Sequence, residues 1–138
     1  MPQVIDIQKE MDTRTFLEGR HVDTPPEELE AAFATLANYR DGGIFAGGFS
    51  GASRWERHRN GDEIVHVLSG TTWLTIMSQS ETETFELTAG MMIIVPQGCW
   101  HRFESETGGW LMTVTPQPTD HTGADDPTET PHNPSVGT

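Results

Sequence analysis

Short runs of alternating apolar and polar residues fill the middle of the chain. Eight such runs, rich in β-branched and aromatic residues, lie between residues 44 and 115 and are separated by glycines and polar turns. Segments of this length and period are typical of strands in an antiparallel barrel or sandwich. The runs are IFAGGFS, SRWERH, DEIVHVL, TTWLTIM, TETFELT, MMIIV, CWHRFE and WLMTVT. We therefore expect an all-β domain over residues 44–115.

The preceding residues, 1–43, show a different pattern. Residues 3–8 are compatible with a short strand, and Thr24 with Glu27 forms a capping box around prolines that suit a first helical turn. Apolar residues then recur at helical spacing, at Leu29, Ala32, Phe33 and Leu36. The glycines at 42 and 43 would end this helix. The pattern predicts an N-terminal arm with one short helix that packs on the barrel.

The last segment, residues 116–138, has the composition of an extended tail. It holds five of the nine prolines and four acidic residues, and it contains no Lys or Arg. Ala124 and Val136 are its apolar anchors, which are too few for a core of its own. We expect an acidic, Pro- and Thr-rich tail after the barrel.

Charge and composition exclude several function classes. The formal net charge of -13 and the pI near 4.6 disfavour nucleic acid and anionic membrane surfaces as partners. The sequence contains neither an apolar stretch of roughly 20 residues nor a signal-peptide pattern, so a cytoplasmic protein is expected. The single cysteine, Cys99, cannot form an internal disulfide, and we interpret it as a buried, inert thiol.

The candidate chemistry lies around Asn60-Gly61, a strong hairpin signal between two strand-like runs. In a two-residue hairpin His58 would pair with Glu63, and opposed residues share one face of the sheet. Glu56, His58 and Glu63 would then lie together, forming a metal site that lacks one further ligand. A surface turn with salt bridges is the alternative, but parity places the neighbouring arginines on the opposite face.

The opposite face of the same hairpin is predicted to be apolar. Parity directs His66 outward beside Trp55, so packing or an interface is a better interpretation for it than metal binding. Ile64 and Leu68 also point outward, and such a face needs cover. Either the helical stripe or a second subunit could supply it, and we expect a homodimer.

Two segments of the barrel region resemble the conserved motifs of the cupin superfamily. The matching positions are Glu63, Gly70, Gly90, Pro96, Gly98 and His101, with His58 where the first motif has the second histidine of its pair. The resemblance covers about residues 44–115 and implies a small single-domain RmlC-like cupin. The implied fold is a double-stranded β-helix, or jelly-roll, barrel.

The resemblance also implies a ligand set. One divalent first-row metal ion would be held by His58, Glu63 and His101, with Glu56 where the family usually has its first histidine. Two histidines and two carboxylates suit Fe, Mn, Zn or Ni. Alternatively, Glu56 is a base and three residues bind the ion.

Two functions follow from this set. The first is a metal-dependent enzyme, an oxygenase, isomerase or lyase, acting on a small organic molecule. The second is a non-catalytic module in which the metal anchors an effector or stiffens the barrel. An open coordination position beside a pocket favours the enzyme, and a closed ion in a filled barrel favours the module.

Overall fold

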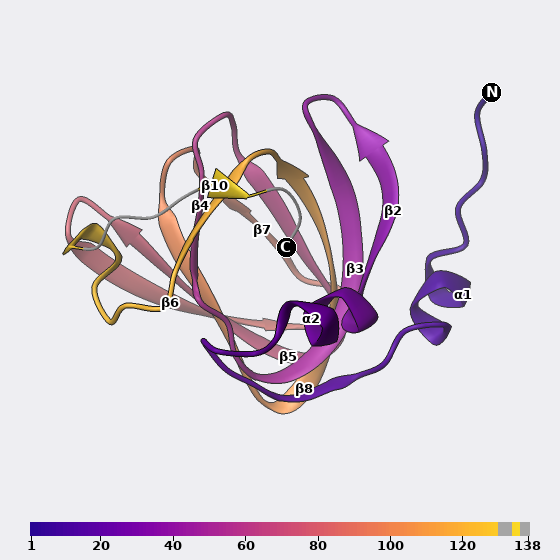
Figure 1. Ribbon diagram of the computed structural model, residues 1–138, viewed down its shortest axis with the longest axis horizontal. Helices are drawn as coiled ribbons and strands as arrows, with labels where there is room; N and C mark the ends of the chain where they lie inside the picture. The colour runs from indigo at the N-terminus through magenta and orange to yellow at the C-terminus, as the bar shows by residue number, and fades with distance from the viewer. Residues whose placement is uncertain (130–133, 136–138) are drawn as a thin grey trace.

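The computed structural model describes residues 1–129 and 134–135, and most of these residues lie in strands that curve round a common interior (Figure 1). The helices are α1 (Ile7–Asp12), α2 (Pro26–Ala32) and the 3-10 turn η1 (Pro127–Glu129). The strands are β1 (Leu17–Arg20), β2 (Phe33–Tyr39), β3 (Gly42–Ala52), β4 (Trp55–His58), β5 (Glu63–Ser78), β6 (Glu81–Thr88), β7 (Met92–Val95), β8 (Trp100–Pro116), β9 (Thr119–Thr122) and β10 (Pro134–Ser135). The ten strands form one sheet, as expected of an all-β barrel.

The long strands β5 and β8 organise this sheet. They pair antiparallel along most of their length, while β3 lies on the other edge of β8 and β6 and β7 lie beside β5. At the corner of the ribbon a Cβ on Gly70 would lie 2.3 Å from the carbonyl oxygen of Gly108, so this close approach requires glycine. Each long strand therefore contains two of the expected runs, joined at a glycine bend.

The apolar core lies inside the barrel and draws on most of the strands. The fully buried members include Phe49, Val65, Val67 and Leu74. Burial alternates along β5, where Glu63, Val65 and Val67 are buried and the intervening residues are partly exposed. This alternation confirms the period of two that predicted the strand.

The N-terminal arm differs from the expectation. α2 ends at Ala32, and the residues expected to continue the helix form β2, antiparallel to β3. Apolar spacing alone misled here, because Ala34 is buried in the strand pairing while Phe33 and Leu36 are half-buried. Backbone pairing with β3 outweighs a weak helical stripe in a segment that includes the aromatic Phe33 and the β-branched Thr35.

The expected capping box is also wrong. Pro25 is the N-cap of α2 and makes no side-chain cap hydrogen bond, while the Thr24 hydroxyl accepts from the His21 backbone N–H at 2.8 Å. A second helix, α1, stands where residues 3–8 were compatible with a strand, and the Asp6 side chain caps it. Neither these helices nor η1 is long and apolar enough to cross a membrane.

The predicted hairpin at Asn60-Gly61 does not form a β4–β5 ladder. β4 pairs with β8 and β9, whereas β5 pairs with β6, β7 and β8. The residues that connect β4 to β5 are instead held by Gln97, which lies in the turn between β7 and β8. Its backbone N–H donates to the Asp62 carboxylate, and its side-chain amide donates to the Arg59 carbonyl. Tertiary partners on the opposite edges of β8 override the local turn signal.

Part of the expected tail belongs to the sheet. Thr119–Thr122 form β9, which pairs antiparallel with β4, and Thr119 and Asp120 are buried. Asp120 accepts hydrogen bonds from Arg57 and Arg59, so polar contacts supply the anchorage that apolar residues do not. Two other parts of the tail, residues 130–133 and 136–138, lie outside the described part of the chain.

Candidate metal centre

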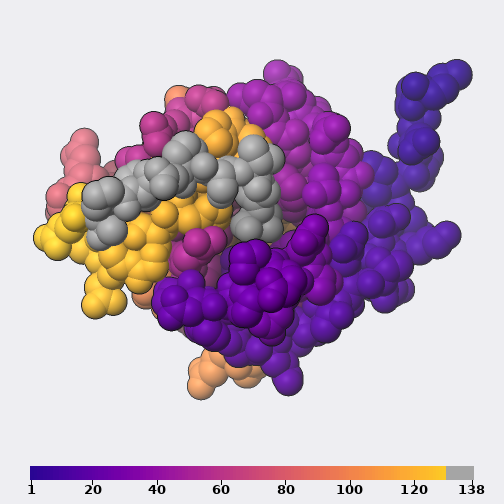
Figure 2. Space-filling view, viewed as in Figure 1, coloured from indigo at the N-terminus to yellow at the C-terminus, as the bar shows by residue number. Residues whose placement is uncertain are grey.

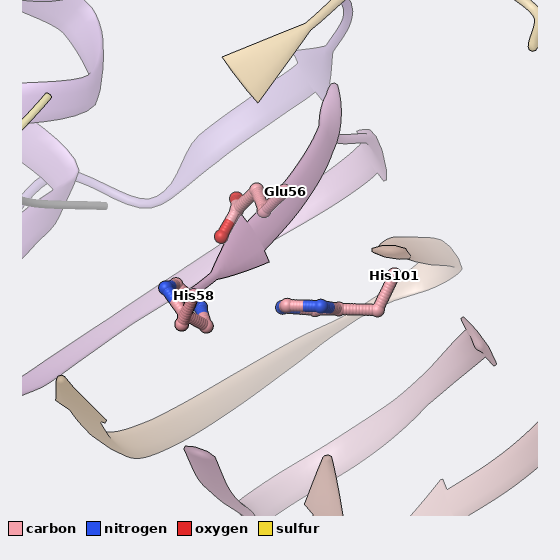
Figure 3. A group of neighbouring side chains, drawn as sticks. All are labelled: Glu56, His58 and His101. Carbon is pink, nitrogen blue, oxygen red and sulfur yellow. The ribbon is translucent and has the colours of Figure 1, made fainter. Parts of the chain in front are cut away.

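Four buried polar side chains meet inside the barrel. Glu56 and His58 come from β4, Glu63 begins β5 and His101 lies near the start of β8. Their exposed fractions are 4% or less. Ligand atoms of Glu56, His58 and His101 all lie within 4.8 Å of one another, and Figure 3 shows these three side chains converging.

Glu63 completes the cluster. Its Oε1 lies 3.1 Å from His101 Nε2, and its Oε2 lies 3.2 Å from His58 Nε2. The Thr115 hydroxyl donates to Oε2 at 2.6 Å and fixes the carboxylate. The structure thus brings all four expected residues together, although the hairpin that predicted their meeting is absent.

The bend in β8 explains how these side chains meet. His101 and Thr115 both approach Glu63, yet fourteen residues of straight strand would separate them by roughly 45 Å. The bend near Gly108 returns the end of β8 to the region where it begins, and the matching corner of β5 is at Gly70. The cluster is therefore a product of the folded ribbon.

Both imidazoles direct Nε2 into the cluster. His101 Nδ1 lies 3.0 Å from the Cys99 carbonyl oxygen, which can only accept, so Nδ1 carries the hydrogen. His58 Nδ1 lies 3.0 Å from the Thr119 hydroxyl, which donates to Gln117. In this arrangement each Nε2 presents a lone pair, as metal-binding histidines do when a second group holds the other nitrogen.

The donor atoms fit a metal ion. His58 Nε2, His101 Nε2 and Glu63 Oε1 are buried and make no hydrogen bond with the described residues, despite their close approach. Buried polar atoms are normally satisfied, so three converging ones call for an explanation. A cation among them would satisfy all three, and two imidazoles with carboxylates form a donor set for first-row divalent ions.

The electrostatics of the cluster also favour a positive charge at its centre. Burial opposes ionisation of Glu63, but its contacts with His101 and His58 outweigh burial and lower its pKa. Burial likewise opposes the charged form of His101, yet the contact with Glu63 raises its pKa. A proton or a metal ion would serve the same purpose, because each places positive charge between imidazole and carboxylate.

A small cavity opens beside the cluster. Its volume is about 20 Å³, and Glu56 and Glu63 contribute to its wall. Arg20 lies in the same wall, 3.7 Å from Glu56 Oε1. Arg20 could not be predicted from the sequence, because a single arginine in the N-terminal arm belongs to no motif or periodic pattern. Thr115 could have been found, since it is polar at an inward position of an alternating run.

The other singled-out residues lie outside this cluster. His66 is half-buried and pairs with Met92 and Met112 on neighbouring strands, away from the buried face of β5. Cys99 is partly exposed, which corrects the expectation of a buried thiol, although it still packs against the core. A further histidine, His121 of β9, is half-buried and pairs with Glu56 across β4 and β9, so its backbone lies directly beside that of Glu56.

Comparison with known proteins gives a family match and several structural likenesses. A family model described as a cupin domain matches residues 45–115. A cupin-2 domain protein from Shewanella frigidimarina is 26% identical, with a TM-score of 0.50 over 62% of this chain and 80% of that one. Protein NMB1881 from Neisseria meningitidis is 16% identical, with a TM-score of 0.58 over 83% and 100%.

A third solved structure is a hydroquinone 1,2-dioxygenase from Sphingomonas sp. TTNP3, with 4-hydroxybenzoate bound. It is 14% identical and has a TM-score of 0.53 over 76% of this chain and 81% of that one. Likeness at this identity shows a shared fold. Comparison with curated proteins gives no match.

Proposed function

The chain belongs to the cupin-domain family, and from that premise we propose that it binds one divalent first-row transition metal ion through Glu56, His58, Glu63 and His101. The observation that carries the proposal is the convergence of buried, unsatisfied nitrogen and oxygen atoms at one point. Fe, Mn, Zn and Ni all suit two imidazoles and two carboxylates. The ion would serve a metal-dependent enzyme that acts on a small organic molecule.

The residues have separate tasks in this proposal. The Cys99 carbonyl and the Thr119 hydroxyl hold the two imidazoles so that each Nε2 faces the site. The Thr115 hydroxyl fixes Glu63, while Glu56 faces both the cluster and Arg20. Glu56 is therefore the carboxylate placed to bind the ion or to accept a proton from a molecule in the cavity. A bound divalent ion would supply Lewis acidity toward an oxygen atom of the substrate.

Elemental analysis of tag-free protein tests the metal proposal. We expect about one equivalent of a first-row metal per chain, and its loss in both His58→Ala and His101→Ala. Circular dichroism should show that each variant keeps its strands. A wild-type protein that neither contains nor takes up Fe, Mn, Zn or Ni would contradict the proposal.

The small cavity supports the second candidate, a non-catalytic module. A volume of about 20 Å³ is on the scale of a few water molecules, so the barrel is nearly filled. The enzyme remains our first proposal, because two carboxylates of the cluster line that cavity and a molecule within it would touch them. Metal-dependent turnover of a small substrate would decide for the enzyme, and ligand binding without turnover would decide for the module.

We also propose a homodimer, formed through an outer apolar patch on β5, β7 and β8. Ile64 pairs with Ile94 on one side and with Val114 on the other, so the three share one face. Met92 and Ile94 are more than half exposed. α2 packs chiefly against β1, β2 and β3, so it is not the cover for this patch. A second copy of the chain is the proposed cover.

Analytical ultracentrifugation tests this dimer. Ile94→Lys should place a charge in the interface and give a monomer, while metal content stays the same. Val22→Lys is the matched control, because Val22 is also an exposed apolar residue but lies in the N-terminal arm. A wild-type protein that stays monomeric throughout the micromolar range would contradict the dimer.

A further inference from the structure

Arg20 is a buried cation in the wall of the barrel cavity. It ends β1, a short strand that lies parallel to β3, and its exposed fraction is 8%. Its guanidinium lies over the rings of Phe33 and Phe49, at 5.1 and 5.0 Å from their centroids. In Figure 2 the N-terminal arm, in indigo to violet, extends across the lower part of the face shown. The arm thus delivers a positive charge to the barrel interior.

This guanidinium forms a long ion pair with a carboxylate of the cluster. Its ion-pair partner among the described residues is Glu56, at 3.7 Å from Nη2 to Oε1, which is longer than a hydrogen bond. A guanidinium carries five N–H donors, and the Glu56 carboxylate lies too far from Nη2 to accept one of them. Burying a charge in this way is costly without hydrogen-bond partners, so a cation kept in a cavity wall points to an acceptor that enters the cavity.

The charges around the cavity indicate the sign and size of that acceptor. The charged residues in the cavity wall are Arg20, Glu56 and Glu63, so two negative charges face one positive charge. A divalent ion bound to the carboxylates would leave one positive charge in excess, which a single anionic group would neutralise. The rest of the wall is mainly apolar, formed by Phe33, Phe45, Phe49, Phe103 and Leu111.

We propose that Arg20 anchors the carboxylate of a small organic monoanion in the cavity beside Glu56 and Glu63, with the apolar part of the ligand against the phenylalanines. The inference rests on the proposed metal site and names the substrate class for it. A planar guanidinium can donate two parallel hydrogen bonds to a carboxylate, which fixes its orientation as well as its charge. The cavity of about 20 Å³ restricts the ligand to a few non-hydrogen atoms unless side chains move.

Acetate and acetamide are suitable probes, because they have nearly the same shape and differ in charge. Zinc-loaded, isotope-labelled protein would be titrated with each while NMR follows the Nε–H resonance of Arg20. We expect acetate to shift this resonance and acetamide to leave it unchanged at the same concentration. This measurement uses the wild-type chain, so it does not depend on whether an Arg20 variant folds.

Variants supply the second measurement. Arg20→Gln should weaken acetate binding by at least about tenfold, the loss expected for a charge-assisted hydrogen bond, while zinc stoichiometry is retained. Arg20→Lys keeps the charge but loses the planar donor pair. Its affinity for acetate should therefore lie between that of the wild type and that of Arg20→Gln. Arg40→Gln is the matched control, because it removes the same charge from an exposed residue outside the cavity wall.

The outcomes separate this inference from the metal proposal. Zinc binding with an unresponsive Arg20 resonance, or with full acetate affinity in Arg20→Gln, would overturn the inference and leave Arg20 as a structural counter-ion of Glu56. If the wild type takes up none of Fe, Mn, Zn and Ni but its Arg20 resonance still responds to acetate and not to acetamide, the anion site stands and the metal proposal fails.

Discussion

The interior of the barrel has two regions with opposite chemistry, although the same strands build both. β5 contributes Glu63 to the polar cluster and Leu74 to the apolar core, and β8 contributes His101 to the cluster and Phe103 to the core. Both regions are equally buried. The core gains free energy from removing apolar area from water, whereas the cluster concentrates polar atoms that need a cation. Burial therefore stabilises the fold in one region, and in the other region it serves the proposed metal binding.

The largest expected effect on stability lies in the apolar region. Leu74→Ala removes a fully buried side chain, and we expect it to lower the free energy of unfolding by about 2–5 kcal/mol, measured by urea denaturation. Metal stoichiometry of the folded variant should be retained. Trp73→Ala is the control, because Trp73 is the neighbouring residue on β5 and is 39% exposed. It should lower the free energy of unfolding by less than Leu74→Ala does. Equal costs would erase the distinction between inner and outer positions of β5.

In the polar region we expect the opposite result, a large loss of metal affinity with a small change in stability. His101→Gln should weaken metal affinity by at least about a hundredfold, since one ligand is lost from a site whose supporting contacts alone are worth 10–100-fold. Competition with a chelating dye would measure it. Unfolding of the metal-free variant should change less than that of Leu74→Ala, because the Gln amide can still donate a hydrogen bond to Glu63 and His58 remains beside that carboxylate. A large loss of stability in metal-free His101→Gln would show that the cluster is structural.

Along β5, local alternation was enough to predict which residues face inward, whereas Trp55 of β4, expected on the outer face beside His66, is buried and pairs with Thr122. Glu63, Val65 and Val67 follow the expected parity, and the likeness to cupin motifs identified His101. Strand pairing was not predictable in the same way, because the partners of β4 depend on residues far along the chain. The four side chains meet through the bends at Gly70 and Gly108, not through a hairpin at Asn60-Gly61.

The N-terminal arm shows the same limit. Arg20 reaches the cavity because β1 pairs with β3, and no local sequence pattern predicts this pairing. The helical stripe through Leu36 was a local signal as well, and pairing of β2 with β3 overrode it. The period of two correctly predicted the strands, whereas the helical stripe and the Asn60-Gly61 hairpin failed because other strands pair with those segments.

An intermediate effect is expected at the edge of the polar region, where Asp120 holds β9. Asp120→Asn leaves Arg57 and Arg59 without their shared carboxylate, so we expect a loss of about 1–3 kcal/mol at neutral pH. The hydrogen bond from Arg59, with help from Arg57, lowers the pKa of Asp120. Its stabilisation is therefore present above its ordinary pKa of about 3.9 and is lost as the pH falls through the lower value in the folded state.

Urea denaturation of wild type and Asp120→Asn over a range of pH would measure this contribution. The difference between the two proteins should be constant near neutrality and should shrink below about pH 4. Glu129→Gln is a control, since it also removes one acidic charge but its carboxyl is exposed. A difference that grew on acidification would contradict the assigned ion pairs.

The smallest effect is expected at His66, which tests the comparison from outside the barrel. His66 lies one position from Val65 and Val67, but its ring faces the outer side of the sheet beside Met92 and Met112. His66→Ala should leave metal affinity unchanged and alter the free energy of unfolding by about 0.5 kcal/mol or less, as for other positions away from the core. Competition with a chelating dye would measure the metal affinity of His66→Ala in parallel with that of His101→Gln. If His66→Ala lost metal as His101→Gln does, alternation would not separate the two faces of β5, and the polar cluster could not be assigned to the interior of the barrel.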